Sequence, residues 1–350
     1  MTSKILPHLH PEYLPFVSVY AKEIPEFFEP FFDSPALLRL KGVGQNCGTE
    51  FSKMYSYRAA YSRLDHSLGV ALIVWNFSKD VKASLAGLFH DISHTAFSHV
   101  GDFLLGDAEN QESAELHTRS ILERDPVIPV ELAKLGLTVA DVEDYSRFPI
   151  ADNPGPKLSA DRLEYTLSSA RSLNFKTMDE IRSLYGSLVA VSAEDEAVAF
   201  DDAEKAEEFA LLSIQNDAGC FSSYESVSAM SFLAAILKRL SDIGGIRPME
   251  LYTLQDADFI ERIRNSNDEE LRKMWNFFEK METYKILRYP RETDGFCVST
   301  KCKRRFIDPL VSVAGKGHPI RVSEFSEKFR EARDYHLGRK EEWIILPYRP

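Results

Sequence analysis

The sequence predicts a mainly helical fold with a smaller α+β region at its C-terminal end, divided as residues 1–185 and 186–350. Helical hydrophobic patterns follow one another from residue 65 onward, and strand patterns are added after about residue 186. The 350 residues are 44% hydrophobic, a composition typical of globular proteins. A chain of this length folds as one large domain or as two.

The first predicted elements are an irregular segment and two buried helices. Residues 33–58 are rich in glycine, proline and aromatic residues, which favours a short helix followed by a loop or hairpin. From Asp65 the chain is apolar nearly all round at helical spacing, a pattern typical of a buried helix. Residues 84–92 end in LAGLFHDI and indicate a second buried helix.

Two further segments complete the helical part. An amphipathic helix is expected at 109–123, and the sequence ADNPGPK at 151–157 predicts a loop. Ser159 is then expected to cap a helix that begins near Asp161, because a serine hydroxyl accepts a hydrogen bond from a first-turn amide.

The C-terminal half mixes helices and strands. The sequence at 187–202 predicts two short strands around a polar turn, after which Asp202 caps a helix. A methionine and aromatic stripe in one later helix indicates core packing rather than a binding site. Helices are expected at 231–240, 271–281 and 323–335, and strands at 296–301, 306–313 and 343–346.

The acidic composition narrows the classes of partner. With 42 Lys+Arg against 54 Asp+Glu the net charge is −12, which disfavours binding to duplex nucleic acid. The longest apolar runs, 70–75 and 232–237, fall far short of the roughly 20 residues that cross a bilayer. The first 13 residues lack the pattern of a signal peptide. We therefore expect a cytoplasmic protein without a membrane partner.

The cysteines, one basic run and four outlying histidines carry weaker signals. The run KCKRR at 301–305 stands out in an acidic chain. A binding site for a phosphate or a nucleotide effector is one interpretation, but a solvated strand face is the favoured one. The cysteines contain no CxxC pair and are expected to be reduced thiols: Cys47, Cys220, Cys297 and Cys302. The histidines expected at the surface or in loops are His8, His10, His318 and His336.

A group of histidines and aspartates carries the strongest chemical signal. His90 and Asp91 directly follow an apolar run, and burying an ionised carboxylate is costly unless it is paired or bound to a metal. His94 lies one helical turn further on, His66 begins the preceding buried helix, and Asp161 opens a later one. Two imidazoles and two carboxylates suit a transition ion such as Fe, Mn, Co, Ni or Zn. The alternative is that these side chains only cap helices and bond locally.

Three stretches resemble a known family. YSRLDHSLGV at 61–70, LFHDISHTAFSHVGDF at 88–103 and SADRLEY at 159–165 resemble the HD-domain superfamily of metal-dependent phosphohydrolases. The similarity spans residues 33–175 and is greatest to the deoxynucleoside triphosphate triphosphohydrolase branch. It implies a helical HD-domain core and an enzyme that hydrolyses phosphoesters.

The resemblance also assigns residues. It implies a divalent transition metal held by four residues, namely His66, His90, Asp91 and Asp161. It implies substrate contacts from Arg63, Gln45 and Tyr165. Protonation of an alkoxide leaving group needs a general acid, and histidine titrates near neutral pH. The candidates for acid–base or phosphate-contacting roles are His94, His99 and His117, with His94 the better phosphate clamp.

Departures from the family pattern bear on selectivity. The family's HDxGHGP is HDISHTA here, Ser169 stands where some relatives place an aspartate, and Asn110-Gln111-Glu112 replaces a His-Glu pair. Since a lost contact to a sugar hydroxyl relaxes discrimination, we expect weak preference between deoxy and ribo substrates. The predicted function is a nucleotide phosphohydrolase similar to (d)NTP triphosphohydrolases. The alternatives are a nucleoside monophosphate phosphatase or phosphodiesterase of the same superfamily, and a nucleotide-binding sensor without turnover. The resemblance is also compatible with a homo-oligomer.

Overall fold

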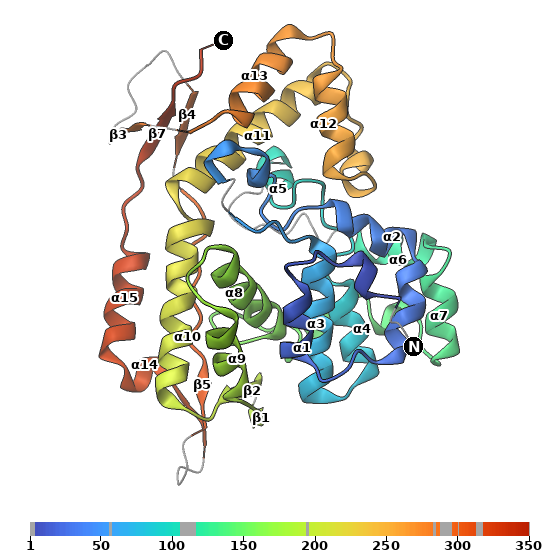
Figure 1. Cartoon of the computed structure of the whole chain (residues 1–350), viewed down its shortest axis with the longest axis vertical. Coiled ribbons are helices and arrows are strands. Elements are labelled where there is room, and N and C mark those ends of the chain that lie inside the picture. The colour runs from blue at the N-terminus through green and yellow to red at the C-terminus, as the bar shows by residue number, and fades with distance from the viewer. Residues whose placement is uncertain are drawn as a thin grey trace.

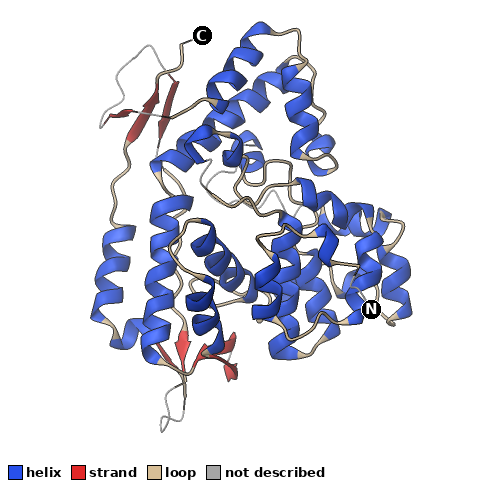
Figure 2. Cartoon of the chain, in the orientation of Figure 1, coloured by secondary structure: helices blue, strands red, loops and turns tan. Residues whose placement is uncertain are grey.

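Helices form most of the molecule, and two small sheets lie at its edges (Figures 1 and 2). A computed structural model of the chain describes residues 4–55, 58–105, 117–193, 196–282, 285–287, 296–299, 301–312 and 318–349. The expectation of a mainly helical fold with a smaller α+β region is confirmed.

A long buried helix, α3 (Arg63–Ser78), lies among the N-terminal helices and packs on α1, α4 and α8. Ser62 accepts a hydrogen bond from the amide of Asp65, whose carboxylate in turn accepts one from the amide of Ser62. The first twelve residues of α3 are all buried, as the apolar pattern predicts. The other helices of this part are α1 (Leu14–Tyr20), α2 (Pro35–Arg39), α4 (Val81–Phe89), α5 (Val100–Leu105), α6 (Thr118–Arg124) and α7 (Ile128–Lys134).

The predicted cap of the next helix is confirmed. Ser159 accepts a hydrogen bond from the amide of Arg162 and begins α8 (Ala160–Ser172), which brings Asp161 into the first turn. Asp202 likewise caps α10 (Ala203–Asn216). The helix expected at 109–123 lies partly outside the described residues, and its described end is α6. The remaining helices are α9 (Met178–Gly186), α11 (Tyr224–Asp242), α12 (Asp256–Arg264), α13 (Glu269–Glu279), α14 (Val322–Phe325) and α15 (Glu327–Leu337).

Between α10 and α11 the chain forms one π-helical turn, Asp217–Phe221. Such turns interrupt the α-helical hydrogen bonding and often occur at functional sites. Here the turn places Cys220 and Phe221 against the large cavity described below.

Two sheets are built largely from C-terminal strands. The first has the order β1-β2-β5-β6, in which β2 and β5 are parallel and the other neighbours antiparallel. The second has the order β3-β7-β4 and is antiparallel throughout. The strands are β1 (Leu188–Ala193), β2 (Glu196–Phe200), β3 (Lys285–Leu287), β4 (Phe296–Ser299), β5 (Leu310–Val311), β6 (Ile320–Arg321) and β7 (Trp343–Leu346).

Two strand predictions were too long. The strand expected at 306–313 is only β5, and the strand expected at 296–301 ends at Ser299, so Cys302 lies outside it. The segment from 301 to 309 is extended without ladder pairing. Side chains in this segment are held by contacts to helices rather than by a neighbouring strand, which the local sequence does not reveal.

The buried apolar residues form two clusters. The first joins α1 to α10 with four residues near the C-terminus: Ile307, Val311, Val322 and Phe329. The second contains α11 to α13, with Met274, Trp275 and Phe278 buried as predicted, and it receives Phe97 and Val100 from the chain after α4. The first cluster therefore crosses residue 185, and a domain division there stays a prediction.

Two findings bear on the membrane and redox expectations. Among the described residues no single helix has the length and apolar composition to cross a bilayer. Residues 203–221 and 224–242 have that length and composition only when they are taken together, as a pair bent by 45°. None of the four cysteines, all within the described ranges, forms a disulfide.

Candidate metal centre and phosphate cavity

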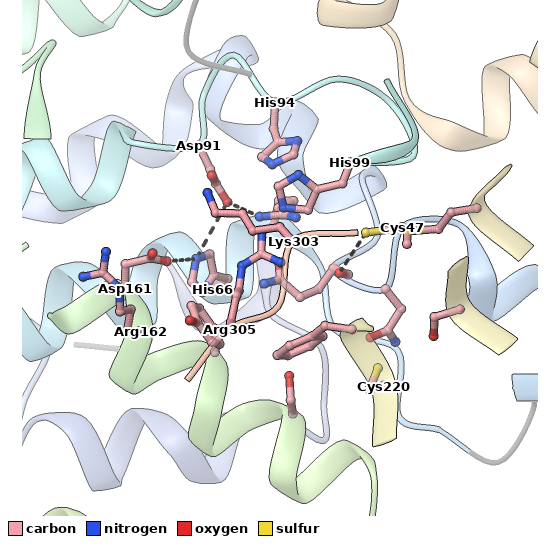
Figure 3. A pocket seen from close by; sticks show the side chains of 18 of the residues that line it. Cys47, His66, Asp91, His94, His99, Asp161, Arg162, Cys220, Lys303 and Arg305 are labelled. Atoms are coloured by element: carbon pink, nitrogen blue, oxygen red, sulfur yellow. Dashed lines mark hydrogen bonds and ion pairs between the residues drawn. The ribbon is translucent and has the colours of Figure 1, made fainter. Parts of the chain in front are cut away.

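A cavity of about 870 Å³ brings most of the candidate residues together (Figure 3). Its lining comes from α3, from the chain between α4 and α5, from the start of α8 and from the π turn. A loop near residue 45, the chain at 145–156, α11 and an extended segment near residue 304 also contribute to the lining. Met230 of this lining belongs to the second apolar cluster, whereas Tyr145 and Phe306 pack against the first.

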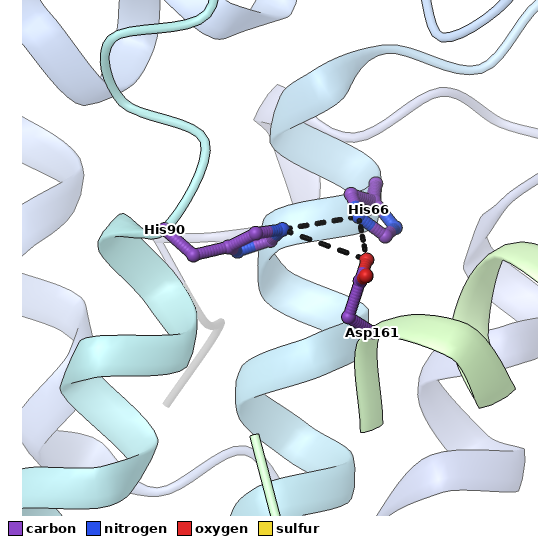
Figure 4. A group of neighbouring side chains, drawn as sticks. All are labelled: His66, His90 and Asp161. Carbon is purple, nitrogen blue, oxygen red and sulfur yellow. Dashed lines mark hydrogen bonds and ion pairs between the residues drawn. The ribbon is translucent and has the colours of Figure 1, made fainter. Parts of the chain in front are cut away.

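Three potential metal ligands converge at one side of this cavity (Figure 4). The Nε2 atoms of His66 and His90 lie 3.2 Å apart. One carboxylate oxygen of Asp161 lies 3.1 Å from Nε2 of His66 and 3.8 Å from Nε2 of His90. Helix α3, the residue that directly follows α4, and helix α8 thus each contribute one donor atom to a compact group.

Both imidazoles present the same nitrogen to this group because the other nitrogen is engaged elsewhere. Nδ1 of His66 donates to the buried carboxylate of Glu164, which also accepts a hydrogen bond from Tyr13 at 2.5 Å. Nδ1 of His90 donates to the carbonyl of Gly87 at 2.7 Å. Such partners fix the tautomer of a ligating histidine and leave Nε2 for the metal.

The fourth expected ligand, Asp91, lies beside this group. Its two carboxylate oxygens are 3.5 Å from Nε2 of His90 and 3.8 Å from Nε2 of His66. One of these oxygens accepts a hydrogen bond from Arg63 at 2.8 Å, and Arg63 also donates to Ser98 at 2.9 Å. Arg63 is therefore held against a predicted ligand as well as lining the cavity.

The electrostatics and donor types fit a divalent cation. Burial alone would raise the pKa of Asp91, but His90 and Arg63 hold it well below its usual range. Burial alone would lower the pKa of His66, but Glu164 and Asp161 raise it to about 10, so positive charge is favoured at this point. The described ligand cluster contains imidazole nitrogens and carboxylate oxygens but no cysteine, a donor set that suits a transition ion. The residues present thus fit the expected metal.

Two further histidines line the cavity beyond Arg63. The rings of His94 and His99 are 4.9 Å apart and nearly perpendicular. Nδ1 of His99 donates to Asp102 at 2.8 Å, which leaves its Nε2 available. Burial lowers the pKa of His99, Asp102 opposes this through its hydrogen bond, and Arg63 lowers it further. Burial and Arg63 also hold the pKa of His94 well below its ordinary value, and its Nδ1 has no partner among the described residues.

The loop that carries these histidines adopts an unusual backbone. Phe97 and Ser98 have φ values of 56° and 52°, a left-handed conformation that costs energy for residues other than glycine. Asp256, at the start of α12, stabilises it by accepting a 2.7 Å hydrogen bond from the amide of Phe97. Its other oxygen accepts one from the amide of Gly44 at 2.9 Å. One buried carboxylate therefore joins two loops of the cavity.

Comparison with known proteins agrees with this geometry. The family model described as HD domain matches residues 63–135. Metal-dependent phosphohydrolase cns2 of Cordyceps militaris is 28% identical, over 83% of the chain and 81% of that protein. Protein YdhJ of Bacillus subtilis is also 28% identical, over 91% of the chain and 94% of that protein. A phosphohydrolase structure from Bacteroides thetaiotaomicron has the same fold, with a TM-score of 0.67 and 14% identity over 93% of the chain and 97% of that structure.

The chain thus contains an HD domain at residues 63–135 and is similar to metal-dependent phosphohydrolases. The expectation of an HD-family metal-dependent enzyme is thereby confirmed, whereas the identity of the metal stays open.

The HD-domain site contains most of the predicted residues but not all. Gln45 and Tyr165 line the cavity, and Tyr165 packs edge-on against Phe221 of the π turn. His117 is not part of the cavity lining; its ring packs against Tyr252 at 4.5 Å. Asn110-Gln111-Glu112 lies outside the described residues. The individual roles assigned to the predicted ligands, substrate contacts and acid–base residues all stay predictions.

Two interpretations of charged residues were wrong. The basic run at 301–305 is not a solvated strand face, because Lys303, Arg304 and Arg305 line the HD-domain cavity. His336 is not a surface residue: it is buried, and its Nε2 lies 2.9 Å from the carboxylate of Asp217. Arg304 is held by the end of α15, and His336 of α15 is held by the π turn. Hydrophobic periodicity cannot predict such contacts between distant segments.

Three residues that support the HD-domain site were missed from sequence. Glu164 orients His66, Asp256 joins two loops, and Arg39 donates to the carbonyls of Ile92 and His94. A signal existed for Glu164, since an acidic residue one helical turn after Asp161 shares its helix face. No local signal marks Asp256, which lies 159 residues from Phe97 in the sequence.

Proposed function

We propose that this HD-domain enzyme hydrolyses a phosphate ester of a nucleotide, with (d)NTP triphosphohydrolase-like cleavage as the leading version. The observation that carries the proposal is that the His66, His90 and Asp161 cluster opens into a cavity large enough for a nucleotide. That cavity also holds aromatic and amide side chains, Tyr165 and Gln45, on its remaining walls. The relative cns2, described as a metal-dependent phosphohydrolase, supports the reaction class.

The side chains around the cluster divide the chemistry among them. A divalent ion bound by His66, His90, Asp91 and Asp161 would act as a Lewis acid toward a phosphoryl oxygen. Arg63 lies beside the cluster, where its guanidinium offers donors to a phosphate oxygen. We assign to His99, whose Nδ1 is held by Asp102, the delivery of a proton from Nε2 to the leaving oxygen. His94, whose imidazole favours the neutral form, serves as a hydrogen-bond donor to phosphate.

The sugar-side wall supports relaxed selectivity. Ser169 lines the cavity where some family members place an aspartate, and the short serine side chain reaches less far toward a sugar hydroxyl. A site that lacks a buried group aimed at a hydroxyl discriminates weakly between substrates with and without it. We therefore expect deoxy and ribo nucleotides to be hydrolysed at similar rates.

Product identification tests the proposed function. Protein loaded with Mn²⁺ is incubated with dGTP, GTP, dGMP and GMP, and the products are separated by ion exchange. Nucleoside with inorganic triphosphate supports triphosphohydrolase-like cleavage, and orthophosphate from the monophosphates alone supports the nucleoside monophosphatase alternative. Absence of turnover with these nucleotides and with a phosphodiester would favour the sensor alternative and contradict the proposal.

The Asp91→Ala variant is the negative control for this experiment. It removes a predicted ligand and the partner of Arg63, so we expect loss of bound metal by elemental analysis and loss of turnover. The melting temperature should also fall, since a bound ion stabilises the folded chain by about RT ln(1 + [L]/Kd). Full metal occupancy in this variant would show that Asp91 is not a ligand.

A further inference from the structure

The basic segment at 303–305 approaches the metal cluster from outside the part of the chain that matches the HD-domain family. The family model ends at residue 135, whereas Lys303 and Arg305 lie in the extended chain between β4 and β5. Both line the same cavity as His66 and Asp91, and in Figure 3 their side chains extend into it. The C-terminal region therefore adds cationic groups to this site, and these groups are not part of the HD motif.

The segment is held in place on both sides. Between Lys303 and Arg305, the guanidinium of Arg304 donates to carbonyls at the end of α15, at 3.0 Å for Leu337 and 3.3 Å for His336. After it, the amide of Ile307 donates to Ser213 of α10 at 3.0 Å, and Ile307 is buried in the first apolar cluster. These anchors fix the backbone, so the positions of the two cationic side chains are set by the fold.

Cationic side chains outnumber carboxylates in the lining of the cavity. Six cationic side chains line it against three acidic ones among the described residues, in a chain whose net charge is −12. Arg63 pairs with Asp91, and Arg162 lies 3.1 Å from Asp152. A divalent metal would add further positive charge. Concentrated positive charge in a cavity of an acidic protein favours an anion with more than one charged group.

Lys303 and Arg305 line the cavity together with the metal cluster and with His99 and Tyr165. Arg63, bonded to Asp91, already offers donors to a phosphate at the metal. The charge of Lys303 and Arg305 therefore suits a further phosphate of the same ligand.

We propose that Lys303 and Arg305 bind a second phosphate of the substrate, so that this enzyme acts on nucleotides carrying at least two phosphates. This proposal rests on the proposed nucleotide phosphohydrolase function and restricts it, because a monophosphate would leave the second position unused. Charge-assisted hydrogen bonds from lysine and arginine are the usual means of holding such a group.

Binding of inorganic triphosphate to metal-free protein tests the site without any turnover. We expect the Lys303→Gln/Arg305→Gln double variant to bind triphosphate about tenfold or more weakly than the wild type by calorimetry. The matched control is Lys301→Gln, which removes a charge from the same segment at an exposed residue outside the cavity lining. Equal affinity in the double variant and the wild type, or no binding by the wild type, would overturn the proposal.

Kinetics on substrates that share one ester bond give the second test. The kcat/KM for release of deoxyguanosine is measured with dGMP, dGDP and dGTP. The double variant should lose about tenfold or more with dGDP and dGTP but little with dGMP, and Arg305→Lys should retain part of the activity. A loss of equal size on all three substrates would contradict a second-phosphate site.

The two tests separate this proposal from the function on which it rests. If no nucleotide is hydrolysed but triphosphate binding depends on Lys303 and Arg305 and not on Lys301, the proposed hydrolysis is wrong and the anion site stands. If nucleotides are hydrolysed with equal efficiency from one to three phosphates, the hydrolysis stands and the second-phosphate site is wrong.

Discussion

The histidines of this site differ in where their free ring nitrogen points, and our predictions of their roles depend on that difference. His66 and His90 both have Nδ1 bonded to the protein and turn Nε2 toward Asp161, the arrangement expected of metal ligands. His99 is also engaged through Nδ1, but its Nε2 lies along the cavity rather than in the cluster. The same residue type is thus held in two different arrangements within one site.

We predict that Asp102→Asn and His99→Gln lower kcat while the metal content is unchanged. His99→Gln removes the proton donor and should cost roughly 10²-fold. Asp102→Asn removes the hydrogen bond that raises the pKa of His99, so that pKa falls further. Because a general acid is active only when protonated, the decline of kcat at high pH should then begin at a lower pH than in the wild type. The pH profile of kcat and elemental analysis provide the measurements.

The contrary outcomes are distinct. Metal loss in His99→Gln would make His99 a ligand, and unchanged kcat would remove it from the mechanism. An unshifted pH profile in Asp102→Asn, with lowered kcat, would show that Asp102 acts only on the structure of the loop.

At the scale of elements, the loop between α4 and α5 depends on a helix from the other end of the chain. Asp256 at the start of α12 holds Phe97, and Ser98 donates to the carbonyl of Gly44, whose amide bonds to Asp256 in turn. Ser98 also accepts from Arg63, the partner of Asp91. A short chain of hydrogen bonds therefore connects α12 with the metal cluster.

We predict that Asp256→Asn lowers kcat without metal loss. An amide has one acceptor oxygen, so either Phe97 or Gly44 loses its buried partner, at a cost of about 1–3 kcal/mol. The loop should then populate other conformations and His99 should be misplaced. The control is Glu261→Gln, an exposed residue of α12 that carries the same charge. Wild-type kcat in Asp256→Asn would show that the strained loop needs no such support.

The same residue should affect stability as a function of pH. Burial raises the pKa of Asp256 to about 6; Arg39 and Arg63 oppose this, and Glu50 lies close enough to be coupled to it. The folded chain then holds a proton that the unfolded chain releases near pH 4, so this contribution to stability falls as pH rises from about 4 to about 6. The difference in unfolding free energy between wild type and Asp256→Asn, measured across that interval, should show this slope.

For the whole molecule, the distribution of the apolar clusters predicts how the chain unfolds. The first cluster joins N-terminal helices to α10 and to residues of β5, α14 and α15. The second cluster meets it at the loop after α4, which carries site residues. The C-terminal region is therefore part of the structure that supports the site.

We predict that Phe329→Ala destabilises the whole chain. Phe329 of α15 is fully buried in the first cluster, and loss of a buried phenylalanine side chain costs about 3–5 kcal/mol. Phe325→Ala is the control, since Phe325 is 40% exposed and should change stability little. Urea unfolding is followed by fluorescence and by far-UV circular dichroism, which should give coincident transitions. A separate transition that Phe329→Ala leaves unchanged would instead support an independent N-terminal domain.

Much of the helical fold could be predicted because its signals are local. The cap at Ser159, the apolar run of α3 and the paired strands at 188–200 each depend on residues a few positions apart. His66, His90 and Asp161 could be named because they stand in short motifs that resemble the HD-domain family, at the ends of buried helices where ionisable groups need partners. These features belong to segments whose conformation is dictated mainly by their own residues.

Only the tertiary structure decided which distant groups meet at the site. Lys303 and Arg305 lie in an extended segment anchored by α15 and α10, and a basic run has no pattern that distinguishes a cavity wall from a solvated surface. Asp256 reaches Gly44 across 212 residues, and His336 pairs with Asp217 across 119. Such contacts form because packing of the two apolar clusters brings these residues together, and hydrophobic packing is largely non-directional, so the pattern along the chain does not specify which polar groups become neighbours.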